Sequence, residues 1–135
     1  MREAVIITGA SSGIGVAVSE RLCDMDYEVF GFGRNFELCK LKRENFHPII
    51  CDLLDTAKLT EQVKRIAAER EIHVLINNAG VAYYGLHEEL NAKKIAEMVR
   101  TNLEAPMILT QQLLRTLKKN RGTVLNISSV TAAQS

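Results

Sequence analysis

The sequence predicts an α/β fold, a doubly wound parallel sheet of five strands in the order 3-2-1-4-5 with helices on both faces. Apolar runs of strand length alternate with stretches of helical periodicity along all 135 residues. The run Val74–Asn77 is apolar up to its last residue, which is typical of a parallel strand buried on both faces. Right-handed crossovers between the strands then give their order. Because the chain contains no linker, repeat or low-complexity tract, we expect a single domain, residues 1–135.

The first half of the chain supplies three strands. The expected elements are the strand Ala4–Ile7, the helix Gly13–Met25, the strand Glu28–Phe32, a short helix Glu37–Lys42 and the strand Pro48–Cys51. Ile14, Val18 and Leu22 recur at four-residue intervals, which gives the first helix one apolar face. This face predicts that the helix packs on the sheet.

The second half adds two strands and three helices. The expected elements are the helix Thr56–Arg70, the strand Val74–Asn77, the helices His87–Arg100 and Leu103–Lys119, and the strand Thr123–Ile127. Asp55 precedes the first of these helices and has the side chain of a helix N-cap. Pro106 is tolerated only in the first turn of a helix, so a new helix is expected to begin just before it. Gly122 is expected to end that helix.

A glycine-rich turn, Thr8-Gly9-Ala10-Ser11-Ser12-Gly13-Ile14-Gly15, joins the first strand to the first helix. Gly9 allows a sharp turn, Gly13 leaves the peptide N–H groups open to a pyrophosphate, and Gly15 lets the helix pack closely on the strand. The helix N-terminus adds unpaired N–H donors and a partial positive charge. This order predicts a nucleotide phosphate site, although the spacing alone is also compatible with a plain turn.

A second segment of small and polar residues, Asn77-Asn78-Ala79-Gly80, follows the fourth strand. In a sheet of this order, ligands bind beyond the carboxyl ends of the strands where the order reverses, here between the first and fourth strands. Two interpretations stay open. Asn78 and Gly80 contact a ligand, or they tie and turn the strand ends.

Together these motifs resemble the short-chain dehydrogenase/reductase family. The matching residues are the Thr8-Gly9-x-x-x-Gly13-x-Gly15 turn, Asp52, the Asn77-Asn78-Ala79-Gly80 segment, Asn102, and Asn126-Ile127-Ser128-Ser129. The resemblance covers essentially all 135 residues and corresponds to the amino-terminal portion of the family. It implies a Rossmann-like fold and an oxidoreductase that transfers hydride between a nicotinamide cofactor and a carbonyl or alcohol substrate.

The resemblance also implies roles for individual residues. Asp52 and Leu53 would border the adenine, Ile14 and its neighbours would present amides to the pyrophosphate, Ser129 would bind the substrate oxygen, and Asn102 would hold a water molecule. The expected cofactor-binding residues are Gly9, Ser11, Ser12, Gly13, Ile14, Gly15, Arg34, Asp52, Leu53, Asn78, Ala79 and Gly80, and the expected catalytic residues are Ser129 and Asn102. Two structural alternatives stay open: Asp52 caps a strand end, and Asn102 is a polar break between helices.

The end of the second strand bears on the choice of cofactor. An acidic side chain there would accept hydrogen bonds from a free ribose 2′-hydroxyl and repel a 2′-phosphate. This chain has Gly33 at that position, and Arg34, whose planar guanidinium suits a phosphate, follows. By resemblance this favours NADP(H) over NAD(H). The alternative is that Arg34 is an exposed loop arginine.

One family feature is missing from these 135 residues. Family members carry a Tyr-x-x-x-Lys pair on the helix after the fifth strand, and at the family's spacing the pair would fall beyond Ser135. The residues four positions after Tyr27, Tyr83 and Tyr84 are Gly31, His87 and Glu88. We therefore expect the 135-residue chain alone to be inactive. It is either a fragment of an oxidoreductase or a natural short form that binds a dinucleotide or a partner without turnover.

The family's sixth and seventh strands are also missing. The fifth strand would then be an uncovered edge, and such an edge favours pairing with another chain. We therefore expect a homo-oligomer.

Composition excludes several other classes. A net charge of +1 and a pI of about 7.7 provide no basic face for nucleic acid. No apolar stretch is long enough for a signal sequence or a membrane span. Cys23, Cys39 and Cys51 lack metal-ligand spacing and fit reduced cysteines, so we expect a cytoplasmic protein without a metal. Neither the lysine of a phosphate-binding NTPase loop nor the acidic cluster of a phosphoacceptor domain follows the first strand.

Overall fold

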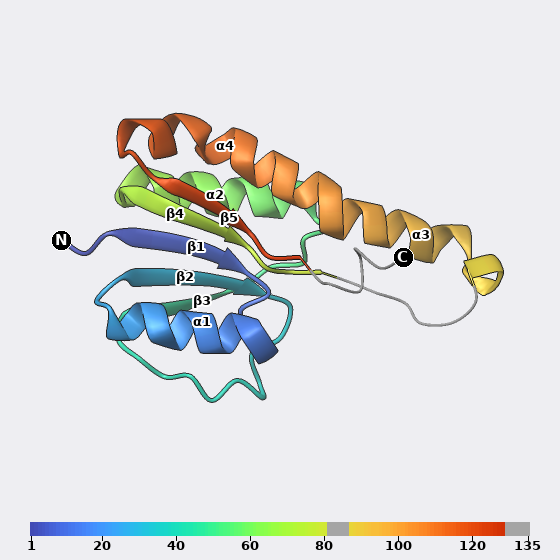
Figure 1. The fold of residues 1–135 in the computed structure, drawn as a ribbon, viewed down its shortest axis with the longest axis horizontal. Coiled ribbons are helices and arrows are strands. Elements are labelled where there is room, and N and C mark those ends of the chain that lie inside the picture. The colour runs from blue at the N-terminus through green and yellow to red at the C-terminus, as the bar shows by residue number, and fades with distance from the viewer. Residues whose placement is uncertain (81–86, 129–135) are drawn as a thin grey trace.

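In the computed structural model, which describes residues 1–80 and 87–128, five parallel strands form one sheet in the order β3-β2-β1-β4-β5 (Figure 1). The strands are β1 Ala4–Thr8, β2 Glu28–Gly33, β3 Phe46–Ile50, β4 Ile72–Asn77 and β5 Thr123–Asn126. The helices are α1 Gly13–Asp24, α2 Thr56–Glu69, α3 Ala92–Val99 and α4 Ala105–Lys119, with a 3-10 turn at His87–Glu89 and a π-helical turn at Arg100–Glu104. The predicted fold class and strand order are confirmed.

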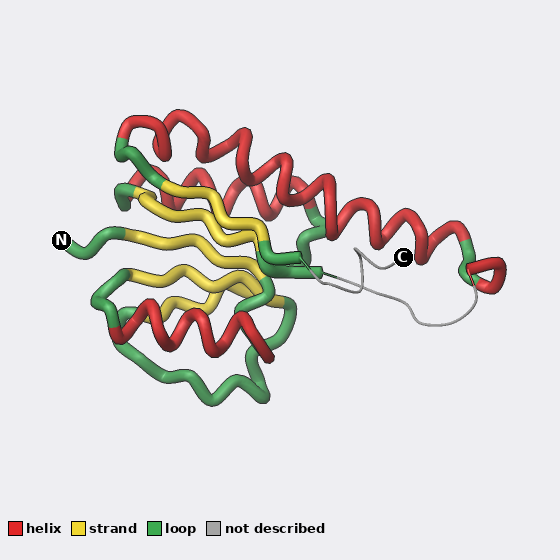
Figure 2. The backbone as a smooth tube through the Cα atoms, in the orientation of Figure 1, coloured by secondary structure: helices red, strands yellow, loops and turns green. Residues whose placement is uncertain are grey.

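Helices cover the two faces of the sheet unequally. α1 lies on one face, over β1 and β2, whereas α2 and α4 lie on the other (Figures 1 and 2). Successive side chains of β1 therefore enter two different cores. The core on the α2 and α4 side contains Ala4, Ile6, Phe32, Cys51, Leu59, Val63, Ile66, Ile72, Leu75, Ala105, Leu109, Leu113 and Leu117. The core beneath α1 contains Val5, Ile7, Ala10, Cys23, Val29, Phe46 and Ile76.

The strand β5 forms one edge of the sheet and pairs with β4. All four of its residues are exposed, Val124 and Leu125 included. In this part of the chain the sheet is buried at its centre and open at β5.

The predicted N-cap of α2 is confirmed. The side chain of Asp55 accepts a hydrogen bond from the backbone N–H of Lys58 at 3.1 Å. This bond satisfies one of the amide donors that the first helical turn leaves unpaired. It also fixes the direction in which the chain leaves the segment after β3.

The short helix predicted at Glu37–Lys42 is wrong. The segment between β2 and β3 contains isolated turns in its place. The Asn35 side chain accepts a hydrogen bond from the Glu37 N–H at 2.8 Å, and the Cys39 N–H donates to the Phe36 carbonyl at 3.1 Å. Six residues are too few to offset the cost of helix nucleation, so these turns do not extend into a helix.

The prediction of two helices separated by a break is also wrong. α3 begins after Asn91, whose side chain accepts a hydrogen bond from the Lys94 N–H at 2.8 Å, and then continues through the π-helical turn into α4. The Ala105 N–H donates to the carbonyl of Arg100, five residues earlier, so the extra residue is absorbed without unwinding the helix. Pro106 lies in the first turn of α4, as expected. Asn102 is therefore part of a continuous helical segment and is not a polar break between helices.

Candidate functional site

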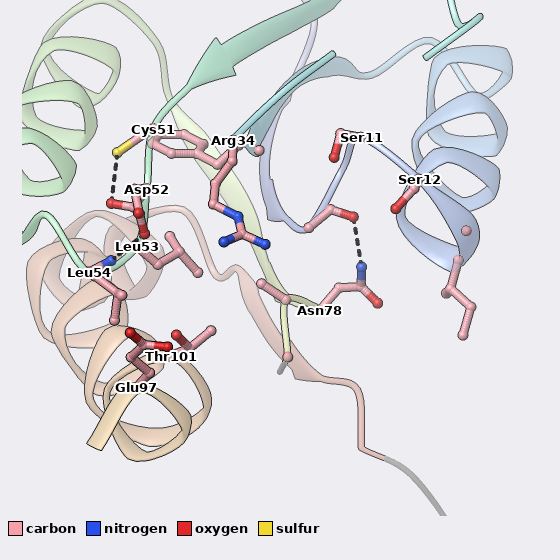
Figure 3. Close-up of a pocket in the computed structure, with 17 residues that line it drawn as sticks. Ser11, Ser12, Arg34, Cys51, Asp52, Leu53, Leu54, Asn78, Glu97 and Thr101 are labelled. Carbon is pink, nitrogen blue, oxygen red and sulfur yellow. Dashed lines mark hydrogen bonds between the residues drawn. The ribbon is translucent and has the colours of Figure 1, made fainter. Parts of the chain in front are cut away.

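A cavity of about 560 Å³ opens at the carboxyl ends of the strands, where the strand order reverses between β1 and β4 (Figure 3). It is lined by Gly9, Ser11, Ser12, Gly13, Ile14, Phe32, Gly33, Arg34, Cys51, Asp52, Leu53, Leu54, Asn78, Ala79, Gly80, Glu97 and Thr101. The structure thus brings together eleven of the twelve expected cofactor-binding residues, all except Gly15. They come from the ends of four strands and from α1.

The three glycines of the turn have three different geometries. Gly9 and Gly13 have φ angles of +65° and +54°, a backbone conformation that favours glycine. A Cβ atom on Gly13 would meet nothing within 4 Å, so the backbone is open to the cavity there. A Cβ atom on Gly15 would lie 1.8 Å from the carbonyl oxygen of Gly9, so Gly15 serves the close approach of helix and turn.

The N-terminus of α1 faces this turn. Ser12 is the N-cap residue, but its side chain makes no capping hydrogen bond. The first N–H groups of α1 therefore donate no hydrogen bond to that hydroxyl. A helix N-terminus of this kind attracts an anion through its N–H groups and its dipole.

Thr8 begins the glycine-rich turn but was not among the expected cofactor-binding residues, and it joins the two loops of the site. Its Oγ1 accepts hydrogen bonds from the N–H groups of Asn78 at 3.1 Å and Ala79 at 3.0 Å. In return, the Asn78 side-chain amide donates to the carbonyl of Gly9 at 3.1 Å. The structural interpretation of Asn78 therefore holds, and the residue also lines the cavity. The sequence signal for Thr8 was a hydroxyl at the end of an otherwise apolar strand.

A side chain at Gly33, at the end of β2, would be crowded by its neighbours. A Cβ atom there would lie 3.0 Å from Ser11 Cβ, 3.1 Å from Ser11 Oγ and 3.0 Å from the ring of Phe36. The next residue, Arg34, extends its guanidinium into the cavity, as Figure 3 shows. The end of β2 therefore presents the Arg34 cation to the cavity and no carboxylate at position 33.

The segment after β3 forms the opposite wall. Asp52 Oδ1 accepts a hydrogen bond from the Leu54 N–H at 2.9 Å, which is the strand-end role that had been left open for this residue. Beside it, Cys51 is buried and its Sγ donates to the Asp52 carbonyl at 3.6 Å. Burial raises the pKa of the Cys51 thiol, so the side chain stays neutral at physiological pH.

The two residues expected to be catalytic differ in what the structure shows of them. Asn102 lies in the π-helical turn, and its Oδ1 would be 3.7 Å from a Cβ atom built on Gly80. The helical segment therefore carries Asn102 to the carboxyl end of β4, beside the cavity. Ser129 lies outside the described residues.

Comparison with known proteins agrees with this geometry. A family model described as short chain dehydrogenase matches residues 3–135. The chain belongs to the short-chain dehydrogenase family. The NADPH-dependent 3-dehydrocapnine reductase of Ornithobacterium rhinotracheale, a relative, is 36% identical over 141 residues, which cover 96% of this chain and 50% of the reductase. The chain spans about half the length of the curated relatives it matches.

Two solved structures have the same fold. ElxO with NADP bound is 29% identical with a TM-score of 0.84, and the match covers 98% of this chain and 58% of ElxO. A short-chain dehydrogenase from Leptospira borgpetersenii with bound NAD+ is 24% identical with a TM-score of 0.90, over 98% of this chain and 54% of that one. Because the second identity is so low, that match supports the fold alone.

Residues 1–80 and 87–128 contain no cluster of three or more His, Cys, Asp or Glu side chains that would hold a metal ion. Among the helices of those same ranges, none has the length and apolar character needed to cross a bilayer.

Proposed function

We propose that this chain forms the NADP(H)-binding portion of a short-chain dehydrogenase that transfers hydride between the nicotinamide and a carbonyl or alcohol substrate. The observation that carries the cofactor preference is the pair Gly33 and Arg34 at the end of β2. Position 33 is a glycine, and Ser11 and Phe36 would crowd any side chain there, so no carboxylate stands at that position to repel a 2′-phosphate. Arg34 offers a charge-assisted contact to the same phosphate.

Other residues of the cavity are assigned to the rest of the dinucleotide. The open backbone at Gly13 and the first amides of α1, next to Ser11, Ser12 and Ile14, would hold the pyrophosphate. Asp52 and Leu53 would border the adenine, and Asn78, Ala79 and Gly80 would approach the other half of the cofactor. The NADPH dependence in the name of the Ornithobacterium reductase and the NADP in ElxO support the preference.

The nicotinamide supplies the hydride when the cofactor is bound. The role of this chain's own residues is to orient the reactants. Asn102, held beside Gly80 by the helical segment, would position a water molecule, and Ser129 would bind the substrate oxygen. Neither side chain titrates near neutral pH, so proton exchange requires another group.

The cofactor preference is tested by titrating the purified protein with NADPH and with NADH. We expect NADPH to bind more tightly than NADH. Arg34→Ala should weaken the binding of NADPH by roughly 1.5 to 3 kcal/mol and leave the binding of NADH almost unchanged. Arg115→Ala, which removes an exposed arginine of α4, is the matched control. Equal affinity for the two cofactors, or an Arg34→Ala variant that behaves like the control, would contradict the preference.

We also propose that the chain assembles with a second copy of itself. Val99, Leu103 and Met107 recur every four residues along the continuous helical segment, and all three are exposed. An apolar stripe of this kind favours association. Sedimentation analysis of the wild-type protein and of Leu103→Glu would test it, because a monomer in both cases contradicts the proposal.

A further inference from the structure

The helical segment that carries Asn102 has little packing of its own. Within residues 92–104, which form α3 and the π-helical turn, Thr101 is the one buried residue. The helix that follows is different, because α4 buries Ala105, Leu109, Leu113 and Leu117 in the core. Apolar burial therefore stabilises α4 and gives the turn before it little support.

A side-chain hydrogen bond holds this turn from outside the helix. The Arg100 guanidinium donates to the carbonyl of Leu54, which lies in the segment after β3 and lines the cavity. The Arg100 Nε atom also lies 3.8 Å from the Glu104 carboxylate, but both side chains are exposed and such a pair contributes little. The bond to Leu54 is therefore the contact that fixes the first residue of the turn.

The acceptor of this bond is fixed by its own loop. Asp52 Oδ1 accepts a hydrogen bond from the Leu54 N–H at 2.9 Å, and the Asp52 carbonyl accepts one from the Asp55 N–H at 2.9 Å. These two bonds hold the peptide groups on both sides of Leu54 without the help of Arg100. Arg100 therefore ties a weakly packed helical turn to a well-supported loop.

The same turn determines where Asn102 lies. Side chains two positions apart lie on different faces of a helix, so Arg100 and Asn102 reach different neighbours. The Ala105 N–H donates to the Arg100 carbonyl, and this backbone bond makes the turn move as one unit. A rotation that separates Arg100 from Leu54 would therefore also move Asn102, whose Oδ1 lies 3.7 Å from a Cβ atom built on Gly80.

We propose, on the basis of the proposed function, that Arg100 is a positioning residue for Asn102. Its hydrogen bond to Leu54 keeps Asn102 beside Gly80, where the nicotinamide half of the dinucleotide would approach. Arg100 is not among the residues that line the cavity, so it acts through Asn102. Arg100→Lys retains a charged donor on a long side chain, whereas Arg100→Leu removes the donor.

The first experiment observes Asn102 directly and contains no cofactor. Proton–nitrogen NMR spectra record the side-chain amide signal of Asn102, which is assigned by its loss in Asn102→Ala. The wild-type protein is compared with Arg100→Leu, Arg100→Lys and Arg115→Leu. Arg115 is an exposed arginine of α4 that does not line the cavity, so its variant is the matched control.

We expect Arg100→Leu to shift the Asn102 signal toward its position in the urea-unfolded protein. The backbone signals of Leu109 and Leu113 should stay in place, because the core holds α4. Arg100→Lys should restore most of the wild-type position, and Arg115→Leu should leave it unchanged.

The second experiment tests whether Arg100 affects the cofactor through Asn102. Dissociation constants are measured for NADPH and for adenosine 2′,5′-bisphosphate, which lacks the nicotinamide half. Arg100→Leu should weaken NADPH by about three- to tenfold, the factor of one hydrogen bond, and leave the bisphosphate nearly unchanged. In the Asn102→Ala background the same substitution should have no further effect, because the two residues act as one unit.

Three results overturn the inference. They are an Asn102 signal that Arg100→Leu leaves in place, a shift of the α4 backbone signals in that variant, and an NADPH affinity that Arg100→Leu either does not change or lowers by the same factor with and without Asn102. A wild-type protein that binds neither ligand contradicts the proposed function instead. The NMR comparison still tests Arg100 in that case, so the two failures are distinguishable.

Discussion

At the scale of single residues, two glycines of the turn have different roles, one in ligand binding and the other in folding. Gly13 has positive φ and open space around its missing side chain, whereas Gly15 has no space at all. We expect Gly13→Ala to lose dinucleotide binding at a cost of about 1 to 2 kcal/mol in stability, because an L residue is strained in this conformation and its Cβ occupies the approach of the pyrophosphate. Gly15→Ala should mainly destabilise the fold. NADPH titration beside urea unfolding measures both effects, and a Gly13→Ala variant that binds normally would mean that the loop is only a turn.

A second residue-scale prediction concerns the hydroxyl of Thr8. Thr8 is buried, and its hydroxyl accepts hydrogen bonds from the N–H groups of Asn78 and Ala79. Thr8→Val keeps the shape but leaves two part-buried donors without this acceptor, so we expect a loss of about 1 kcal/mol in unfolding free energy together with weaker NADPH binding. Thr8→Ser retains the oxygen and serves as the control. Equal stability of the two variants would show that the bonds do not matter.

At the scale of elements, the amino ends of β1 and β2 are joined by charges on the side of the sheet away from the cavity. Arg2 lies 2.7 Å from Asp26, 2.9 Å from Glu44 and 3.4 Å from Glu28, and Glu28 also contacts His47. Burial raises the pKa of the Glu28 carboxyl, but the hydrogen bonds and charges of His47 and Arg2 outweigh it and leave the pKa below its usual value.

This depressed pKa sets the sign of a pH effect. Glu28 contributes stability above its unfolded pKa, near 4.3, and loses that contribution as the pH falls through the lower folded value. We therefore expect Glu28→Gln to cost about 1 kcal/mol at neutral pH and progressively less below about pH 4. Urea unfolding at several pH values checks this. A difference between wild type and variant that does not change with pH would contradict it.

The elements also show where sequence reasoning succeeds. The strands and their order could be predicted because each apolar run is bounded by a turn and because crossovers have one hand. The helix expected at Glu37–Lys42 did not form because six residues are too few to offset the cost of helix nucleation. The break expected before Pro106 failed because a π-helical turn accommodates the proline. The periodicity of apolar residues predicts neither the absence of a short helix nor the presence of a π-helical turn.

At the scale of the whole molecule, the site is assembled from segments that periodicity treats separately. The turn after β1 and the segment after β4 carry motifs, so their meeting at one edge of the sheet could be predicted. The position of Glu97 and Thr101 at the cavity could not be predicted, because it depends on the path of α3. That path is fixed by the hydrogen bond from the Arg100 side chain to the Leu54 carbonyl. Eleven of the seventeen lining residues were thus expected from the sequence, whereas the wall formed by Glu97 and Thr101 required the structure.

The last prediction concerns catalysis by a polypeptide of these 135 residues. No tyrosine in it is followed four residues later by a lysine, and Asn102 does not exchange a proton near neutral pH. General acid or base assistance is commonly worth about 10² to 10⁴-fold. We therefore expect the polypeptide to bind NADPH but to reduce aldehydes, ketones and quinones far more slowly than a version extended through a Tyr-x-x-x-Lys helix. NADPH consumption by the two polypeptides is the measurement. Comparable turnover would show that residues within the 135 supply the proton, and the assignment of Asn102 and Ser129 to orientation alone would then have to be abandoned.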